Sequence, residues 1–210
     1  MQGYSLSLEL LDDVAEYCRA ERLISRPAKR IRRPNREEME RIITWFRAPK
    51  LARRQGPPMY LILWFAIYSC RRQAEIFDMR LGDYDRDRGT WLIRSVKHPG
   101  GSAGHDLAMR VPDKLKPLIE TIIRDVPRTD DRLLPFNSRT IGSYWRNQMR
   151  LLGIDDLHFH DLRREGVSRL AEDGLTIPEM QRVSLHESWS SLQIYVNLPP
   201  TQEARLEWEP

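Results

Sequence analysis

The sequence has few cysteines and no long apolar run. Its 210 residues include only Cys18 and Cys70, which is too few for a disulfide framework and fits a reducing cytosol. Neither cysteine belongs to a C-x-x-C pair, so no thiolate zinc site is expected. The best apolar segment, 59–70, is shorter than the ~20 residues that span a bilayer. No basic start followed by an apolar stretch marks a signal peptide, and a cytoplasmic location is expected.

Positive charge is concentrated in one segment. The formal net charge is only +4, but residues 26–36 contain no acid, whereas residues 203–209 lean acidic. A polyanion such as DNA would favour such a basic segment. A solvated, flexible arm explains it equally well. The basic side chains are Arg26, Lys29, Arg30, Arg32, Arg33 and Arg36.

Composition and the positions of prolines divide the chain into four parts. A helix is expected in residues 1–23, where apolar residues from Leu8 to Leu23 recur at helical spacing. Residues 24–35 carry two prolines and the basic cluster, and indicate a linker. Residues 36–198 form the main domain, and residues 199–210 form a tail. The first helix is interpreted as a possible remnant of a preceding domain.

The main domain is predicted to be α+β and mainly α. Asn35 and Glu38 form a capping-box pattern before a helix over 36–47. Residues 59–70 are apolar nearly all round, which indicates a buried central helix. A small three-stranded antiparallel sheet is expected from segments 83–85, 90–96 and 107–111, with a turn at 87–89. The remaining helices are expected over 72–79, 112–124, 138–152, 160–172, 176–183 and 188–196.

Polar residues near the end of the domain form an ordered series. The series consists of His160, Arg163, His186 and Tyr195, with 23 residues from Arg163 to His186 and 9 from His186 to Tyr195. This resembles the tyrosine recombinase (phage integrase) family, in which an H-x-x-R box precedes an LGH-like box and then a tyrosine. The order and both intervals match the family, although an isolated H-x-x-R would carry no weight.

Two further features extend the resemblance over roughly residues 36–198. Residues 70–76, CRRQAEI, resemble the family box GLR-x-x-E-L. Aligning Glu75 selects Arg72 rather than Arg71 as the active-site arginine. Lys97 ends a predicted strand before an R-V-P segment, and is similar to the family's hairpin lysine.

The resemblance implies the catalytic fold and the chemistry of a site-specific DNA recombinase. Tyr195 is the expected nucleophile, forming a 3′-phosphotyrosyl intermediate without metal, ATP or another cofactor. Arginines suit this reaction because each guanidinium is a permanently charged fork for phosphate oxygens. Arg72 and Arg163 are expected to clamp the phosphate and His186 to donate a hydrogen bond to it. His160 is the candidate base, Lys97 the candidate acid and Glu75 an orienting group.

The resemblance also implies partners. Double-stranded DNA is the expected substrate, with a tetramer assembled on it and no membrane or small-molecule partner. An N-terminal core-binding domain is expected in the family, and residues 1–23 would be its remnant. The tail either passes to a neighbouring subunit or covers its own domain. The linker arginines expected to contact DNA are Arg30, Arg32, Arg33 and Arg36.

Other interpretations stay open for the sequence. The chain could be a catalytically inactive or truncated DNA-binding relative, or a type IB topoisomerase-like enzyme with the same chemistry. A metal-dependent nuclease is a third alternative. His158 and His160 are spaced like metal ligands, but no carboxylate cluster follows them, so no metal site is expected. Each polar box alone also has an ordinary explanation, such as a surface ion pair for Arg72 and Glu75.

Overall fold

A computed structural model describes residues 14, 16–17, 30–48, 56–96, 104–196 and 205–210. The chain divides into two units, residues 1–31 and 32–210. In the first unit residues 14, 16 and 17 are helical, and the rest of the expected N-terminal helix lies outside the described residues. All elements discussed below belong to the second unit.

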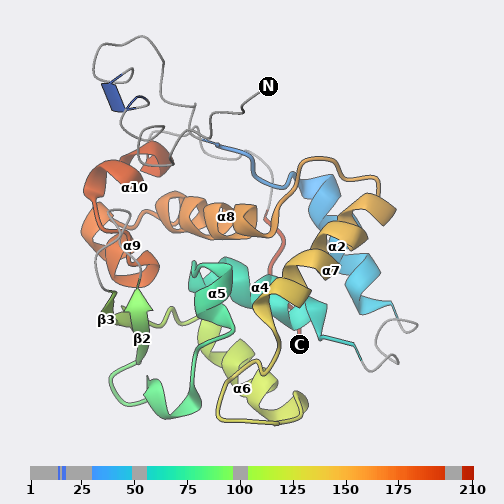
Figure 1. Cartoon of the computed structure of the whole chain (residues 1–210), viewed down its shortest axis with the longest axis horizontal. Helices are drawn as coiled ribbons and strands as arrows, with labels where there is room; N and C mark the ends of the chain where they lie inside the picture. The colour runs from blue at the N-terminus through green and yellow to red at the C-terminus, as the bar shows by residue number, and fades with distance from the viewer. Residues whose placement is uncertain (1–13, 15, 18–29, 49–55, 97–103, 197–204) are drawn as a thin grey trace, which may run out of the picture. The chain divides into compact units, whose positions relative to one another are not determined.

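The second unit is mainly helical with one small sheet, which confirms the predicted class (Figure 1). The helix boundaries of this unit's described residues agree with the sequence predictions to within about three residues. The elements, in chain order, are α2 (Arg36–Arg47), α4 (Met59–Ser69), α5 (Gln73–Ile76), the 3-10 turn η1 (Leu81–Asp83), β1 (Tyr84–Asp85), β2 (Thr90–Val96), β3 (His105–Arg110), α6 (Leu115–Asp125), α7 (Ser138–Leu151), α8 (Phe159–Glu172), α9 (Ile177–Ser184) and α10 (Trp189–Val196).

Local signals explain where several elements begin and end. The predicted capping box at α2 is present: Glu38 N donates to Asn35 Oδ1 at 2.8 Å, and Asn35 N donates to Glu38 Oε2 at 2.9 Å. The helix expected over 72–79 was predicted too long, because α5 covers only Gln73–Ile76. Beyond it the backbone of Met79 accepts from Leu133 N at 2.9 Å, so pairing with a distant segment replaces the helix.

The sheet has the order β1-β2-β3 and is antiparallel throughout. Trp91 in β2 lies opposite Tyr84 on one side and Met109 on the other. Trp91 and Met109 are fully buried, and the Tyr84 and Trp91 rings stack at 4.8 Å. Gly89, at φ +62°, makes the predicted turn between β1 and β2. The register shifts between Ile93 and Val96, at the end of β2 that precedes Lys97.

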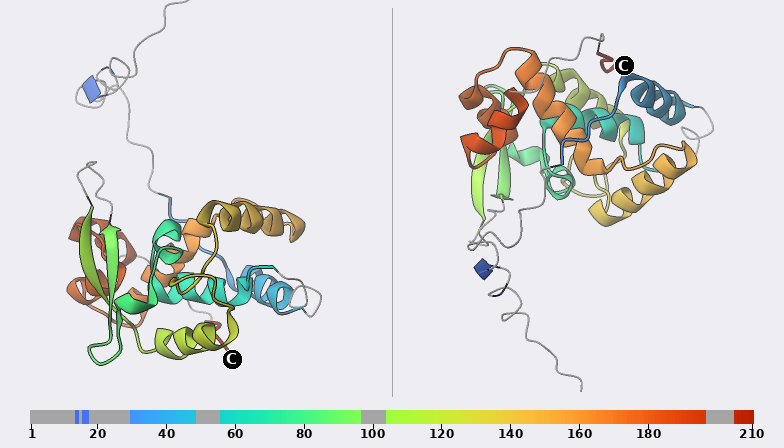
Figure 2. Two further views of the ribbon diagram at one scale, coloured as in Figure 1. Left: turned by 60° about the horizontal axis from the view of Figure 1, so that its bottom comes forward. Right: turned by 90° about the horizontal axis from the view of Figure 1, so that it is seen from above.

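Helix α4 forms the centre of the core, as its uniform apolarity predicted. It packs against α8 and α6, and α9 packs against β3 and α10 (Figures 1 and 2). The contact between α4 and α8 is very close at Gly166. A Cβ added there would lie 1.9 Å from Ile67 O and 2.9 Å from Cys70 Sγ. Only glycine therefore allows α8 to lie this near the end of α4.

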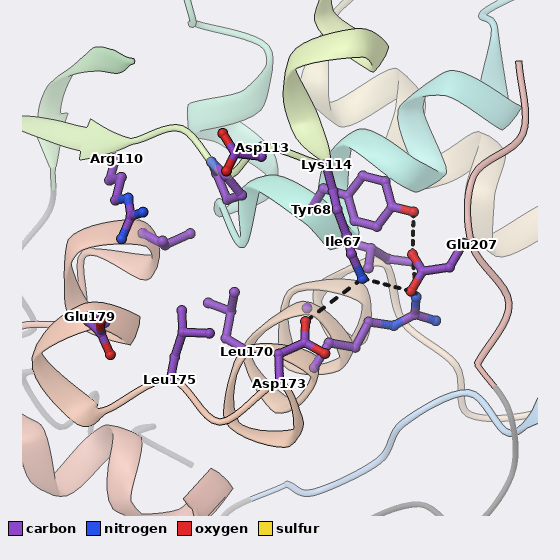
Figure 3. Close-up of a pocket in the computed structure, with 14 residues that line it drawn as sticks. Ile67, Tyr68, Arg110, Asp113, Lys114, Leu170, Asp173, Leu175, Glu179 and Glu207 are labelled. Atoms are coloured by element: carbon purple, nitrogen blue, oxygen red, sulfur yellow. Dashed lines mark hydrogen bonds and ion pairs between the residues drawn. The ribbon is translucent and has the colours of Figure 1, made fainter. Parts of the chain in front are cut away.

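Residues 205–210 of the tail lie on the tail's own unit. Glu207 accepts a hydrogen bond from Tyr68 Oη at 2.6 Å and pairs with Lys114 at 3.0 Å. Tyr60 Oη donates to Glu209 O at 2.8 Å. Glu207 also lines a cavity of about 350 Å³ between α4, α8 and α9, into which Lys114 projects (Figure 3). Two roles were considered for the tail, and the contacts of residues 205–210 agree with the one in which it covers its own domain.

Candidate active site

Arg163, in the first half of α8, is the centre of the candidate site. Its residue is only 3% exposed. Nη1 donates to Cys70 O at 2.7 Å, and Nη2 donates to Ser184 O at 3.1 Å. Cys70 follows α4 and Ser184 ends α9, so one guanidinium joins three helices. Burial and then the charge of Arg72 lower the pKa of Arg163 to about 10, which leaves it cationic at neutral pH.

His186 lies directly against this arginine. Its ring nitrogens are 3.2 and 3.3 Å from Arg163 Nη2, and Nδ1 is 2.8 Å from Ser184 Oγ. Burial, followed by the charges of Arg163 and Arg71, lowers the pKa of His186 to about 3. The ring is therefore neutral at pH 7. If the Ser184 hydroxyl donates to Nδ1, the ring proton resides on Nε2 and can be donated to an incoming anion.

Glu75 is surrounded by three arginines. Its Oε1 is 2.9 Å from Arg72 Nη1, and its Oε2 is 3.4 Å from Arg71 Nη1 and 4.0 Å from Arg163 Nη1. Burial opposes ionisation of Glu75, but Arg71 and the other arginines outweigh it and lower the pKa. Three cations facing one carboxylate leave an excess of positive charge, which favours binding of an anion.

The tandem arginines point in different directions. The side chain of Arg71 is fully buried, whereas that of Arg72 is 35% exposed. The division arises at Cys70, which ends α4 in the left-handed region at φ +53°. Cys70 occupies the glycine position of the family box when Glu75 is aligned. Of the pair, Arg72 is thus the one accessible to a substrate, and this supports the alignment that selected it.

Tyr195 and His160 approach the same region from different helices. Tyr195, in α10, is half-buried against Val167, Met180 and Leu192, and its ring centroid is 6.3 Å from that of His186. Burial raises the pKa of Tyr195, although Arg164 and Arg163 oppose the shift. His160 lies in the first turn of α8 with an exposed side chain. Desolvation by neighbouring atoms and then repulsion by Arg163 lower its pKa to about 4. Both groups are neutral at pH 7.

The linker arginines engage carboxylates of the protein. Arg33 Nε is 2.8 Å from Glu165, and its Nη1 is 2.7 Å from Glu172, so this side chain attaches the linker to α8. Arg32 pairs with Glu38 at 2.9 Å and Arg36 with Glu40 at 2.9 Å. Arg30 belongs to the other unit. Contact of these four residues with DNA stays a prediction.

One expected site residue cannot be placed, and two residues that were not expected contribute contacts to the site. Lys97 lies outside the described residues. Arg71 and Ser184 were not expected to contribute. The tandem arginines and the box Ser184-Leu185-His186 were the only signals for them. Leu185 lies immediately before His186 and adopts φ +48°. In the family's LGH box this position is a glycine.

The described residues offer neither a metal site nor a membrane-spanning helix. No group of three or more His, Cys, Asp or Glu side chains within them could hold a metal ion. Nε2 of His158, which was considered as a metal ligand, lies 3.6 Å from Oδ1 of Asp156. No helix in the described segments is long and apolar enough to cross a membrane.

Comparison with known proteins assigns the family. Residues 33–201 match the phage integrase family. The chain is 29% identical over 170 residues to a shufflon-specific DNA recombinase of Escherichia coli, covering 80% of this chain and 41% of that protein. It is 24% identical over 202 residues to the tyrosine recombinase XerA of Thermococcus kodakarensis, covering 90% and 65%.

The fold agrees with solved structures. The Tn1549 transposon integrase in complex with transposon right end DNA superposes with a TM-score of 0.65 at 10% identity, covering 93% of this chain and 77% of that one. This chain spans less than two thirds of the length of the curated relatives named above. The family match extends over most of the second unit and includes every box that carries the candidate site. The chain therefore belongs to the phage integrase family of tyrosine recombinases.

Proposed function

We propose that this chain is the catalytic domain of a site-specific DNA recombinase that cleaves and rejoins DNA through Tyr195. The observation that carries the proposal is that Arg72 and Arg163 both face Glu75 while His186 lies against Arg163, so that positive charge is in excess. A phosphodiester gathers negative charge on its non-bridging oxygens in the transition state. Fixed cationic donors that need no reorganisation stabilise that charge.

Each residue has a proposed role in one displacement at phosphorus. Tyr195 Oη forms a bond to the scissile phosphorus while the bond from phosphorus to the 5′ oxygen breaks. His160, neutral at pH 7, accepts the phenol proton, and Lys97 supplies a proton to the leaving oxygen. Arg72 and Arg163 bind the non-bridging oxygens, and His186 donates to one of them. The proposed active-site residues are therefore Arg72, Lys97, His160, Arg163, His186 and Tyr195. Glu75 orients the arginines.

The free site keeps its nucleophile protonated. Only about one phenol in a thousand ionises at neutral pH without perturbation, and burial raises the pKa of Tyr195 further. Attack therefore depends on a nearby base and on the arginines. The phosphotyrosine bond conserves the energy of the broken linkage, because one phosphodiester replaces another. A free 5′ hydroxyl can then reverse the step without ATP, and the exchange requires no metal or other cofactor.

The proposed substrate is double-stranded DNA. A solved relative of this fold is in complex with transposon right end DNA. The proposal extends to a tetramer assembled on DNA, to contacts from Arg30, Arg32, Arg33 and Arg36, and to action in the cytoplasm on bacterial or phage DNA. Phosphate contacts of this kind would make binding fall steeply with salt.

A covalent-trapping assay tests the function. Duplexes randomised around a single nick serve as suicide substrates, because loss of the short nicked strand prevents religation. We expect wild-type protein to form a denaturation-resistant adduct that survives EDTA, and Tyr195→Phe to form none. Tyr144→Phe, a half-buried tyrosine in α7, is the matched control and should behave as wild type. No adduct with any sequence would contradict the proposal, and DNA cleavage without an adduct that EDTA abolishes would indicate a metal-dependent nuclease.

A further inference from the structure

Arg71 is a buried cation to which the displacement at phosphorus assigns no role. Its residue is 1% exposed, and it is among the largest fully buried side chains in the described part of the chain. Burying a guanidinium is costly unless it is paired and hydrogen-bonded. In the family box GLR-x-x-E-L this position holds leucine, so the core here accommodates a charge where an apolar side chain would suffice. Such a replacement needs a specific compensating interaction.

The contacts of Arg71 join two segments of the candidate site. Nη2 donates to Val183 O at 3.1 Å, 112 residues away in sequence. Nε donates to Ser69 O at 3.4 Å, at the end of α4. Nη1 lies 3.4 Å from Glu75 Oε2. Arg71 thus connects the ends of α4 and α9 to the carboxylate that also holds Arg72.

The contact with α9 falls at the end of that helix. The last four carbonyls of a helix lack intrahelical partners, and the helix dipole places negative charge there. Val183 O accepts from Arg71, and the next carbonyl, Ser184 O, accepts from Arg163 at 3.1 Å. Two guanidinium groups therefore bind consecutive carbonyls. Immediately beyond them the chain turns at Leu185, φ +48°, and presents His186.

We infer that Arg71 is a positioning residue that holds the turn bearing His186, and the carboxylate of Glu75, in the geometry that the phosphate requires. It is assigned no contact with the substrate because none of its side chain is exposed, whereas 4% of the Arg163 side chain remains exposed. Its loss should weaken the chemical step much more than DNA binding, since the exposed arginines would still attract the backbone. The inference rests on the proposed function where it is tested by DNA cleavage, but not where it is tested by the titration of His186.

Two substitutions separate position from charge. Arg71→Met has a similar length and is apolar, so it removes both the donors to Val183 O and the cation. Arg71→Lys retains the charge, and its ammonium group can donate to either Val183 O or Glu75. Arg169→Met is the matched control: Arg169 is also buried in this fold and pairs with Glu165 at 2.7 Å, but its partners lie outside the candidate site.

The first measurement is the rate of covalent trapping with saturating suicide DNA, together with the dissociation constant for the same duplex. We expect Arg71→Met to lower the trapping rate by about tenfold or more with less than a threefold change in affinity. Arg71→Lys should recover part of the rate. Arg169→Met should be destabilised yet trap DNA near the wild-type rate. If Arg71→Met traps DNA as fast as wild type, or if affinity and rate fall together, the inference is wrong.

The second measurement is the titration of His186 by NMR of the free full chain with labelled histidine. The charged or titratable groups that face this ring are Arg163 and His160 from α8, Arg71 and Arg72 from the segment after α4, and Tyr195 from α10. Removing the Arg71 cation should move the pKa of His186 upward in Arg71→Met and not in Arg71→Lys. A purely structural role would lower stability in both variants without this difference, and an unchanged titration would overturn the inference. Failure of wild type to trap DNA would instead count against the proposed function.

Discussion

Glu75 should be the most sensitive carboxylate of the candidate site. Replacing it with glutamine retains its shape. It removes the negative charge that lies within 4.0 Å of Arg71, Arg72 and Arg163, the only one at that distance among the described residues. At an effective dielectric constant of about 20, an ion pair at these distances is worth about 4–6 kcal/mol before desolvation. Breaking a buried pair typically costs about 3–5 kcal/mol. Because Arg72 is 35% exposed, we expect the lower end, about 3 kcal/mol.

Urea unfolding followed by circular dichroism measures this loss. A loss of about 3 kcal/mol corresponds to a fall in Tm of roughly 6–12 °C for a domain of this size. Sulfate should restore stability to Glu75→Gln more than to wild type, because the variant has a greater excess of positive charge where the anion binds. The comparison is made at constant ionic strength with chloride, so that general screening is the same in both arms.

Glu120→Gln provides the matched control. Glu120 pairs with Arg86 at 3.1 Å, but both side chains are at least half exposed, so the same chemical change should have little effect. The reasoning would be refuted if Glu75→Gln were as stable as Glu120→Gln. Equal stabilisation of Glu75→Gln and wild type by sulfate would also refute it, because the anion would then not respond to the charge at this site.

Two further predictions concern packing and pH. Gly166→Ala should lower the free energy of unfolding by about 2 kcal/mol or more and abolish covalent trapping, because its Cβ would meet the backbone oxygen of Ile67. Gly142→Ala is the control, and its effect should be mild because its Cβ would meet only the end of the Gln73 side chain. Urea midpoints for the two variants test this, and equal losses would contradict it. The folded-state pKa of His186 is about 3, below the ~6.5 of an unfolded histidine, so the unfolded chain binds more protons between these values and stability should fall as pH drops from 6.5. His186 should contribute a slope of up to about 1.4 kcal/mol per pH unit. His186→Asn should remove this contribution, while that of His160, whose pKa is also lowered, remains. An unchanged slope from pH 7 to pH 5 would show that His186 does not contribute to it.

Local patterns in the sequence were sufficient for most of the fold. The Asn35–Glu38 capping box and the uniformly apolar segment 59–70 depend on neighbours within a few residues, and both elements occur where predicted. The helix predicted over 72–79 ends early, at Ile76, because Met79 pairs with Leu133, a partner that no local pattern reveals. Long-range pairing of this kind overrides helical propensity.

The composition of the candidate site was also readable from the sequence, because motif order and spacing bring Arg72, Arg163, His186 and Tyr195 into one series. Their family is now assigned, although their individual roles stay proposals. The spacing could not show which residues support them. Ser184 contributes a hydroxyl to His186 only because α9 ends against Arg163.

The sequence by itself determined the family and most of the elements, and it predicted a set of polar residues for the site, because these depend on local periodicity and on residue identity. Only the tertiary structure decided where neighbouring side chains point. The left-handed conformation at Cys70 turns Arg71 into the core and leaves Arg72 accessible. Arg33, expected as a DNA contact, lies between Glu165 and Glu172, and residues 205–210 of the tail lie on their own unit. Each of these outcomes depends on contacts between segments distant in sequence, which no local pattern encodes.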